Sequence, residues 1–358
     1  MVLKSISINN FRNLDNKNIN FENYFNVFYG KNGQGKTNIL ESIYLLFNLK
    51  SFRFANNIDF IKFGHSYSTI VGISKCNNIE NNYNLKIEKS TKNLLINDKK
   101  PNHLSDFYGD LKVIVFTPDD TNIVKGYPAV RRALLDRAIF LSSPTYLKDL
   151  KHFNNCLKQR NSLLKAPDKS LDVWTEFYIN AAVKVYKERI NYIQRIKPIF
   201  NKIYSNINYS KELVDIIYLN NLTDINYIKK KLEDDLDKNN YREKEFGMTL
   251  YGPHKDDLEF YINEKHIKAY GSQGQQKSFI LAFKAAQVLD IKNQTGYSPI
   301  LLLDDISSEL DMDRQKDFLK FLIDNKGQTF ITTTDNSFYE KNLKNENTFY
   351  EIKDGKII

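Results

Sequence analysis

The sequence predicts an α/β fold: a phosphate-loop nucleotide-binding head into which a second, mainly helical domain is inserted. Residues 30–37 form a G-x-x-x-x-G-K-T loop between a predicted strand and a predicted helix. Residues 300–303 form an apolar run that ends in two aspartates, as a buried parallel strand would. Between them, apolar residues recur at helical spacing. We therefore expect two halves of the head, residues 1–118 and 246–358, separated by a helical insertion at residues 119–245.

The strands and helices expected within these sections follow from the apolar pattern. Alternating or unbroken apolar runs predict strands, whereas apolar residues three and four positions apart predict helices. Pro198 is expected to interrupt the longest helix, because proline lacks the backbone N–H that a helix interior uses. The expected strands are residues 4–11, 19–21, 25–29, 69–74, 84–88, 112–117 and 300–303, and the expected helices of the insertion are residues 131–141, 146–164 and 171–207.

The loop at residues 30–37 has the chemistry of a triphosphate cradle. Glycines let the backbone turn and approach an anion, whose oxygens accept hydrogen bonds from inward-pointing N–H groups. Lys36 would place a positive charge on the β- and γ-phosphates, and Thr37 would offer a hydroxyl to Mg²⁺. A helix is expected to start here, and its N-terminus also favours phosphate. The predicted ATP-binding residues of the loop are Gly30, Lys31, Asn32, Gly33, Gln34, Gly35, Lys36 and Thr37.

Two aspartates follow the apolar run at residues 300–303. Carboxylates at the C-terminal end of a parallel strand lie where open α/β sheets bind their ligands. We expect Asp304 to hold Mg²⁺, directly or through water, and Asp305 to orient or deprotonate the attacking water. A strand that ends in a solvated acidic turn is the alternative, and the phosphate loop elsewhere in the chain makes it the weaker one.

A second candidate anion site lies at residues 272–276, Ser-Gln-Gly-Gln-Gln. The apolar stripe of Phe279, Ile280 and Phe283 predicts that a helix follows this segment, so that a serine and a helix N-terminus would face one anion. An ordinary N-capped helix has the same local pattern. Its place shortly before the aspartate pair favours an ATPase whose two copies clamp ATP between them.

The order of these motifs resembles the ATP-binding-cassette (ABC) ATPase heads of DNA-repair and chromosome-organising proteins. More narrowly, the chain resembles the RecF family of bacterial recombination mediators. The resemblance implies an ABC-type phosphate-loop ATPase head with an inserted, mainly helical second domain. The matching stretches span nearly the whole chain and are residues 10–13, 30–37, 115–120, 131–136, 157–161, 251–257, 272–276, 301–311 and 330–335.

The resemblance also implies roles for single residues. Arg12 would contact the adenine and α-phosphate side of ATP. Ser272, Gln273 and Gly274 would close over the γ-phosphate held by a partner subunit. Residues 308–311, Ser-Glu-Leu-Asp, would cross the dimer interface.

Three positions depart from the wider ABC pattern. Residues 116–118, Phe-Thr-Pro, stand where a metal-contacting glutamine is usual, and Asp305 is one methylene shorter than the usual catalytic glutamate. Residues 332–334, three threonines, stand where a switch histidine is common. These departures favour a slow switch over a fast pump. The expected enzyme is a weak, DNA-stimulated ATPase that acts as a switch.

The charge balance is compatible with a DNA partner. The chain carries 52 Lys and Arg against 43 Asp and Glu, a net charge of +9, although an AT-rich genome alone produces many lysines. Part of the helical section could form a face that follows DNA phosphates, and an ordinary solvated helix surface is the alternative. The candidate cations are Arg131, Arg132, Lys148, Lys151, Lys158, Arg160 and Lys165.

Other features favour a cytoplasmic protein. Cys76 and Cys156 are the only cysteines and lack metal-site spacing, which suits free thiols in a reducing compartment. No apolar stretch reaches membrane-spanning length, and the N-terminus alternates like a strand rather than a signal peptide.

These observations and the resemblance together predict an ATP-dependent DNA-binding protein of replication, recombinational repair and the SOS response. ATP would join two copies into a homodimer on single-stranded, gapped or junction DNA. RecO and RecR would be partners in loading RecA. A transport-coupled ABC ATPase is one alternative, which the helical insertion and the lack of a switch histidine disfavour. A phosphate-loop kinase is another, which residues 272–276 disfavour.

Overall fold

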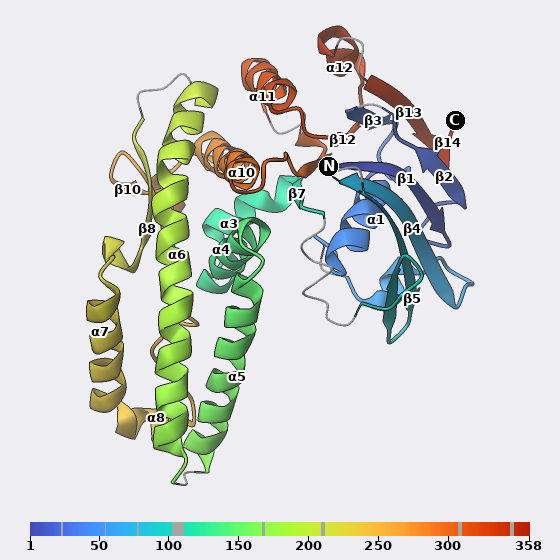
Figure 1. The fold of residues 1–358 in the computed structure, drawn as a ribbon. Helices are drawn as coiled ribbons and strands as arrows, with labels where there is room; N and C mark the ends of the chain where they lie inside the picture. The colour runs from blue at the N-terminus through green and yellow to red at the C-terminus, as the bar shows by residue number, and fades with distance from the viewer. Residues whose placement is uncertain are drawn as a thin grey trace. The chain divides into compact units, whose positions relative to one another are not determined.

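The chain forms two compact units in the computed structural model. The structure describes residues 1–22, 24–53, 55–76, 79–101, 111–166, 169–208, 212–306, 310–343 and 347–358. Unit 1 comprises Met1–Asp120 and Ile291–Ile358, and unit 2 comprises Thr121–Asp290 (Figure 1). The first division lies close to the expected one at 118/119. The second lies at 290/291 instead of 245/246, because residues 246–290 pair and pack with the helical section.

A six-stranded sheet carries the motifs of unit 1. Its order is β14-β13-β3-β12-β11-β7, and all neighbouring strands are parallel except the β13–β14 hairpin. Every residue of β11 and β12 is buried, which explains their unbroken apolar and threonine sequences. The strands are β3 (Phe25–Tyr29), β7 (Val113–Phe116), β11 (Ile300–Asp304), β12 (Thr329–Thr333), β13 (Asn347–Lys353) and β14 (Lys356–Ile357).

A five-stranded antiparallel sheet, in the order β2-β1-β4-β5-β6, forms the second layer of unit 1. The Gln328 amide joins the two layers: it accepts from the Leu3 N–H at 2.7 Å and donates to the Leu3 carbonyl at 2.9 Å. The strands are β1 (Val2–Asn9), β2 (Lys17–Asn20), β4 (Tyr67–Cys76), β5 (Ile79–Glu88) and β6 (Lys92–Ile96).

Helix α1 (Lys36–Asn48) forms the centre of unit 1. Its side chains are almost all buried in one core shared with both sheets, including Leu85 of β5 and Leu302 of β11. A helix buried on every side can point its N-terminus at the edge of the parallel sheet without facing bulk water along its length. The remaining helical segments of unit 1 are η1 (Asn57–Phe60), α11 (Met312–Asn325) and α12 (Ser337–Asn342), and η2 (Pro118–Thr121) ends at the boundary.

Unit 2 consists of helices around a small sheet, with the long helix α6 between α5 and α7 (Figure 1). The sheet has the antiparallel order β10-β9-β8. The helices are α3 (Asn122–Lys125), α4 (Pro128–Ser142), α5 (Tyr146–Lys165), α6 (Leu171–Asn208), α7 (Ile225–Lys238), α8 (Asn240–Phe246), α9 (Ile267–Tyr270) and α10 (Gln273–Thr295), which crosses into unit 1. The short elements are β8 (Val214–Tyr218), η3 (Leu219–Asn221), β9 (Leu258–Ile262) and β10 (Lys265–His266).

The expected interruption at Pro198 was wrong, since α6 continues through it. Pro198 is exposed, so water can bond the carbonyl that lacks its intrahelical donor. Ile196 and Phe200 on either side are fully buried, and their packing holds the helix together. Among the helices described, none combines the length and apolarity needed to cross a bilayer.

Candidate nucleotide-binding site

The phosphate loop joins β3 to α1 and depends on glycine geometry. Gly30, Gly33 and Gly35 have φ values of 145°, 80° and 106°. A Cβ on Gly30 would lie 2.3 Å from the Ile352 carbonyl oxygen of β13, so only glycine fits that position. Gly35 is the N-cap of α1. Backbone turns of this kind allow a loop at a helix N-terminus to direct its N–H groups at an anion.

Lys36 holds its ammonium group over this loop. Its Nζ donates to the carbonyl oxygens of Gly30 at 2.6 Å and Lys31 at 2.9 Å. The pKa of Lys36 is lowered by burial, and the charges of Asp305 and Asp304 offset part of that effect. The positive charge lies near both carboxylates, where a triphosphate and its metal would meet it. Lys31 and Asn32 are exposed at the loop tip.

Thr37 and Asp304 meet at the C-terminal edge of the parallel sheet. The Thr37 hydroxyl donates to Asp304 Oδ1 at 2.7 Å, and the Thr332 hydroxyl donates to the same oxygen at 2.8 Å. The pKa of Asp304 is raised by burial, and the two hydroxyl bonds offset part of that effect. Hydroxyl and carboxylate oxygens are ligands that Mg²⁺ takes in addition to phosphate and water oxygens. The donor set therefore fits the expected metal.

Asp305 leaves the strand in a left-handed conformation, with a φ of 49°. Its N–H donates to the Thr332 carbonyl at 3.2 Å and to the Thr332 hydroxyl at 3.0 Å. Thr332 thus positions both aspartates, a role that the sequence alone did not indicate. At the position of the usual metal-contacting glutamine, Thr117 instead closes a turn onto the Asp120 carboxylate.

Arg12 is held by Glu41, a partner that the sequence reasoning missed. Its guanidinium donates two bonds of 2.9 Å to the Glu41 carboxylate and stacks over Phe60, 5.2 Å from the ring centroid. Glu41 is fully buried on α1. A lone carboxylate inside an apolar helix stripe was the available signal. A nucleotide contact by Arg12 stays a prediction.

The C-terminal hairpin supports the phosphate loop. The Gly355 N–H donates to the Gln34 carbonyl at 3.0 Å, and the Asp354 N–H bonds the Gln34 side chain. A Cβ on Gly355 would lie 2.2 Å from the Asn13 carbonyl oxygen. The Asn13 amide reaches the Gly33 carbonyl at 3.4 Å. The segment at residues 10–13 and the end of the chain therefore brace the loop together.

Ser272 immediately precedes α10 and belongs to unit 2. Its carbonyl accepts the first helical bond, from Gln276, at 3.0 Å, and its hydroxyl accepts from the Gln275 N–H at 3.2 Å. Ser272 and Gln273 are exposed. The helix predicted after residue 276 exists, and it starts at Gln273.

The expected interface segment at residues 308–311 is only partly described. Ser308 and Glu309 lie outside the described residues. Asp311 caps α11 by accepting from the Arg314 N–H at 3.0 Å. Its carboxylate is therefore at an exposed helix start.

Residues 251–257, for which the sequence suggested no role, belong to a buried polar network of unit 2. Arg189, 2% exposed, donates to the Pro253 carbonyl at 2.7 Å and pairs with Asp136 at 2.8 Å. The Tyr218 hydroxyl donates to Asp256 at 2.9 Å, and burial raises the pKa of Asp256 to about 6. His254 bonds the Thr249 carbonyl at 3.0 Å, and burial lowers its pKa to about 4. Hydrogen bonds of this network therefore connect the segment at residues 251–257 with α4, α6 and β8.

The candidate DNA cations divide into two groups. Arg131 and Arg160 are 5% and 3% exposed and pair with Asp257 and Glu243, so these two of the seven candidates are not available to DNA. Arg132 donates to the Asp256 carbonyl at 2.7 Å. The remaining four are exposed on α5: Lys148, Lys151, Lys158 and Lys165.

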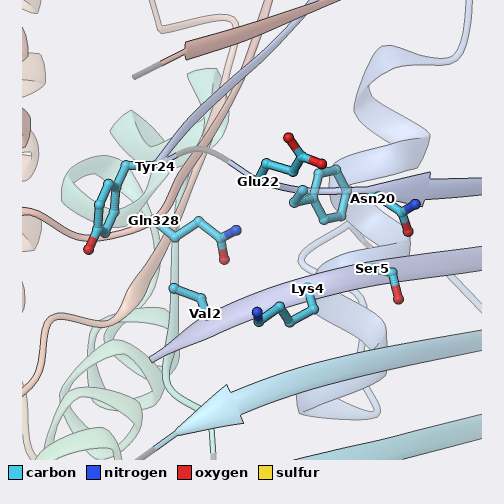
Figure 2. Close-up of a pocket in the computed structure, with 8 residues that line it drawn as sticks. Val2, Lys4, Ser5, Asn20, Glu22, Tyr24 and Gln328 are labelled. Atoms are coloured by element: carbon cyan, nitrogen blue, oxygen red, sulfur yellow. The ribbon is translucent and has the colours of Figure 1, made fainter. Parts of the chain in front are cut away.

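A separate cavity of about 540 Å³ lies in unit 1 (Figure 2). It opens between the start of β1 and the segment before β3, where Lys4, Glu22, Tyr24 and Gln328 line it. Its lining includes no residue of the phosphate loop, so it is distinct from the nucleotide site.

Comparisons with known proteins agree with this architecture. The family model described as the RecF/RecN/SMC N terminal domain matches residues 2–356. A protein named DNA replication and repair protein RecF from Geotalea uraniireducens is 40% identical, with both chains covered completely. The protein of the same name from Syntrophotalea carbinolica is 38% identical over 100% of this chain and 99% of its own.

Solved structures extend the comparison. A structure of the recombination mediator protein RecF with ATP in the RecFOR pathway superposes with a TM-score of 0.91 and 31% identity, over 100% of this chain and 98% of the other. An Smc head bound to the C-winged helix domain of ScpA has a TM-score of 0.60 and 17% identity, over 100% and 97%, and shows a shared fold.

The fold and the loop define an ABC-type phosphate-loop ATPase head, as predicted. Within that class, the chain belongs to the RecF family.

Proposed function

We propose that the chain is an ATP- and Mg²⁺-dependent DNA-binding switch in replication, recombinational repair and the SOS response. The observation that carries the proposal is the meeting of Lys36, Thr37 and Asp304 at one sheet edge. A loop turned by glycines, a buried ammonium group and a buried carboxylate together suit a nucleoside triphosphate with its metal. The ATP-bound relative, at 31% identity over the whole chain, supports ATP as the nucleotide.

The site is proposed to be completed by a second copy of the chain. Ser272, Gln273 and Gly274 stand at the exposed start of a helix, which suits a γ-phosphate held by a partner's loop. Their unit carries no phosphate loop of its own. ATP would therefore act as the bridge between two copies, and hydrolysis would separate them.

Hydrolysis is proposed to be slow. Asp305 is the candidate base that accepts a proton from the attacking water, and it is shorter than the glutamate usual in the class. Thr332, where a switch histidine is common, is already bonded to both aspartates. A slow ATPase suits a protein that must remain on DNA until a signal releases it.

The α5 lysines are the proposed DNA phosphate contacts. Lys151, Lys158 and Lys165 recur every seven residues, so they drift by only about 20° per repeat and share one helix face with Lys148. Exposed Asn155, Gln159 and Ser162 lie between them. Among the residues that the structure describes, none of the four lysines forms an ion pair. Such a face suits a phosphate backbone, as gapped or junction DNA presents.

The wider setting is carried over from the relatives. The solved RecF belongs to a pathway named RecFOR, which supports RecO and RecR as partners. Loading of RecA is the outcome that we propose for this pathway. We propose that the protein acts in this way in the cytoplasm.

Sedimentation with and without a non-hydrolysable ATP analogue tests the proposal. The wild type is expected to dimerise only with the analogue, and Ser272→Arg to bind the analogue yet stay monomeric, because the arginine would meet the partner's nucleotide. Asp305→Asn should retain the dimer with ATP itself. An analogue-dependent dimer of Ser272→Arg, or transfer of phosphate to a small molecule, would reject the clamp.

A further inference from the structure

Gln275 bonds Ser272 twice, from the third residue of α10. Its side-chain Oε1 accepts from the Ser272 N–H at 2.8 Å, while its own N–H donates to the Ser272 hydroxyl oxygen at 3.2 Å. This reciprocal pair is a capping box with glutamine in place of the more common glutamate. Because Ser272 Oγ accepts that bond, its hydroxyl proton remains free to donate elsewhere.

The other end of the Gln275 amide is bonded to a second segment of unit 2. Its Nε2 donates to Glu212 Oε1 at 2.7 Å, and the Tyr204 hydroxyl donates to Glu212 Oε2 at 2.8 Å. Tyr204 is fully buried near the end of α6, where its ring lies 6.4 Å from that of Phe279 on α10. A continuous chain of hydrogen bonds therefore runs from Ser272 to α6.

We propose that Gln275 is a positioning residue for Ser272, and that Glu212 sets the direction of the Gln275 amide. A carboxylate only accepts hydrogen bonds, so Glu212 requires the Gln275 NH₂ group. The amide oxygen must then face the Ser272 N–H. With the amide reversed, NH₂ would face N–H and both bonds would be lost.

The consequence for the clamp rests on the proposed function. A fixed Ser272 backbone presents its hydroxyl proton and the N–H groups of Gln273 and Gly274 in one direction. In the described chain no residue accepts from these two N–H groups. These are the donors that a partner's γ-phosphate would need, and their alignment before binding reduces the entropy lost on closing.

Exchanging the two side chains tests the chain of bonds. Gln275→Glu removes the donor and sets two carboxylates face to face, so that their repulsion turns the new side chain away from Ser272. The double variant Gln275→Glu with Glu212→Gln restores the bonds of this chain, with the donor and acceptor between positions 275 and 212 exchanged. The new amide at position 212 would donate to the new carboxylate at position 275 and still accept from Tyr204. The net charge of the double variant equals that of the wild type. Exposed Glu245→Gln on α8 is the matched control.

Two measurements are needed. In the monomer, hydrogen exchange of the Ser272 amide should rise about tenfold or more in Gln275→Glu, as loss of a hydrogen bond implies, and return in the double variant. With the ATP analogue, the dimer dissociation constant should rise about tenfold in Gln275→Glu and recover in the double variant, while analogue affinity of the monomer stays unchanged.

The outcomes separate the two proposals. If the wild type dimerises and Gln275→Glu does so equally well, the positioning role is rejected. If the double variant fails to recover, the Glu212 link is rejected. If the wild type itself never dimerises, the clamp is rejected, and exchange at Ser272 then decides the positioning role alone.

Discussion

The phosphate loop and the Ser272 loop both lead into a helix N-terminus, but they are held in different ways. The phosphate loop is shaped by its own backbone, with three glycines at positive φ and a lysine bonded to its carbonyls. Ser272 has no left-handed glycine beside it, since Gly271 has an ordinary φ of −75°. Its geometry comes from side chains, one of which is far away in the sequence. A backbone-made loop is local, whereas a side-chain-made loop depends on the folding of its whole unit.

The strongest test of that contrast breaks the polar interior of unit 2. Glu243→Ala would leave the Arg160 guanidinium, 3% exposed, without its 2.7 Å partner. We expect the free energy of unfolding to fall by about 3–5 kcal/mol, because an uncompensated buried charge remains. Urea unfolding measures it. Glu245→Ala, exposed on the same helix, should change it by less than about 0.5 kcal/mol. Equal losses in the two variants would mean that the buried Arg160–Glu243 pair does not stabilise unit 2.

Removing the charge from the phosphate loop should spare the fold and abolish the chemistry. Lys36→Met keeps an unbranched stem but loses the ammonium group, which donates to the carbonyls of Gly30 and Lys31 in the loop. We expect ATP turnover to fall at least about 100-fold, as when a preorganised transition-state donor is removed. Lys50→Met, at an exposed site beyond α1, is the control for both turnover and thermal unfolding. Unchanged turnover in Lys36→Met would refute its role.

A pair of glycines separates backbone strain from close contact. Gly30 and Gly64 both have positive φ, but only at Gly30 would a Cβ meet another atom, 2.3 Å from the Ile352 carbonyl oxygen. Gly64→Ala should cost about 1–2 kcal/mol of unfolding free energy from strain. Gly30→Ala should cost about 1–3 kcal/mol more, because β13 must shift. Similar losses, measured by urea unfolding, would mean that β13 does not constrain the loop.

The smallest expected effect concerns the α5 lysines, which are held by neither backbone nor buried partners. Lys151→Gln and Lys158→Gln should each reduce the log–log salt slope of duplex binding by about 0.9, because each removes one phosphate contact. Lys316→Gln, at an exposed site on α11, should leave the slope unchanged. A titration from low to moderate salt, with the ATP analogue present, measures all three. Identical slopes would place the DNA elsewhere.

The sequence predicted best where the chemistry is local. The motif at residues 30–37 predicted the loop with its lysine and threonine, and the apolar run at 300–303 predicted the buried strand. Pro198 was misjudged because tertiary packing around Ile196 and Phe200 outweighs a local rule. The seven candidate cations could not be sorted, since lysine and arginine look alike in sequence whether solvated or bonded in a core.

By itself, the sequence determined that a phosphate loop precedes a helix, that an acidic pair ends a buried strand, and that a helix follows the segment that begins at Ser272. Glycine geometry, apolar runs and capping act over a few residues, so the order of the residues specifies them. Only the tertiary structure decided that Thr332 bonds both aspartates and that Glu41 holds Arg12. It also decided that Glu212 orients Gln275. Each of those bonds joins segments that are distant in the chain, and burial, which makes such bonds strong, exists only once the units have folded.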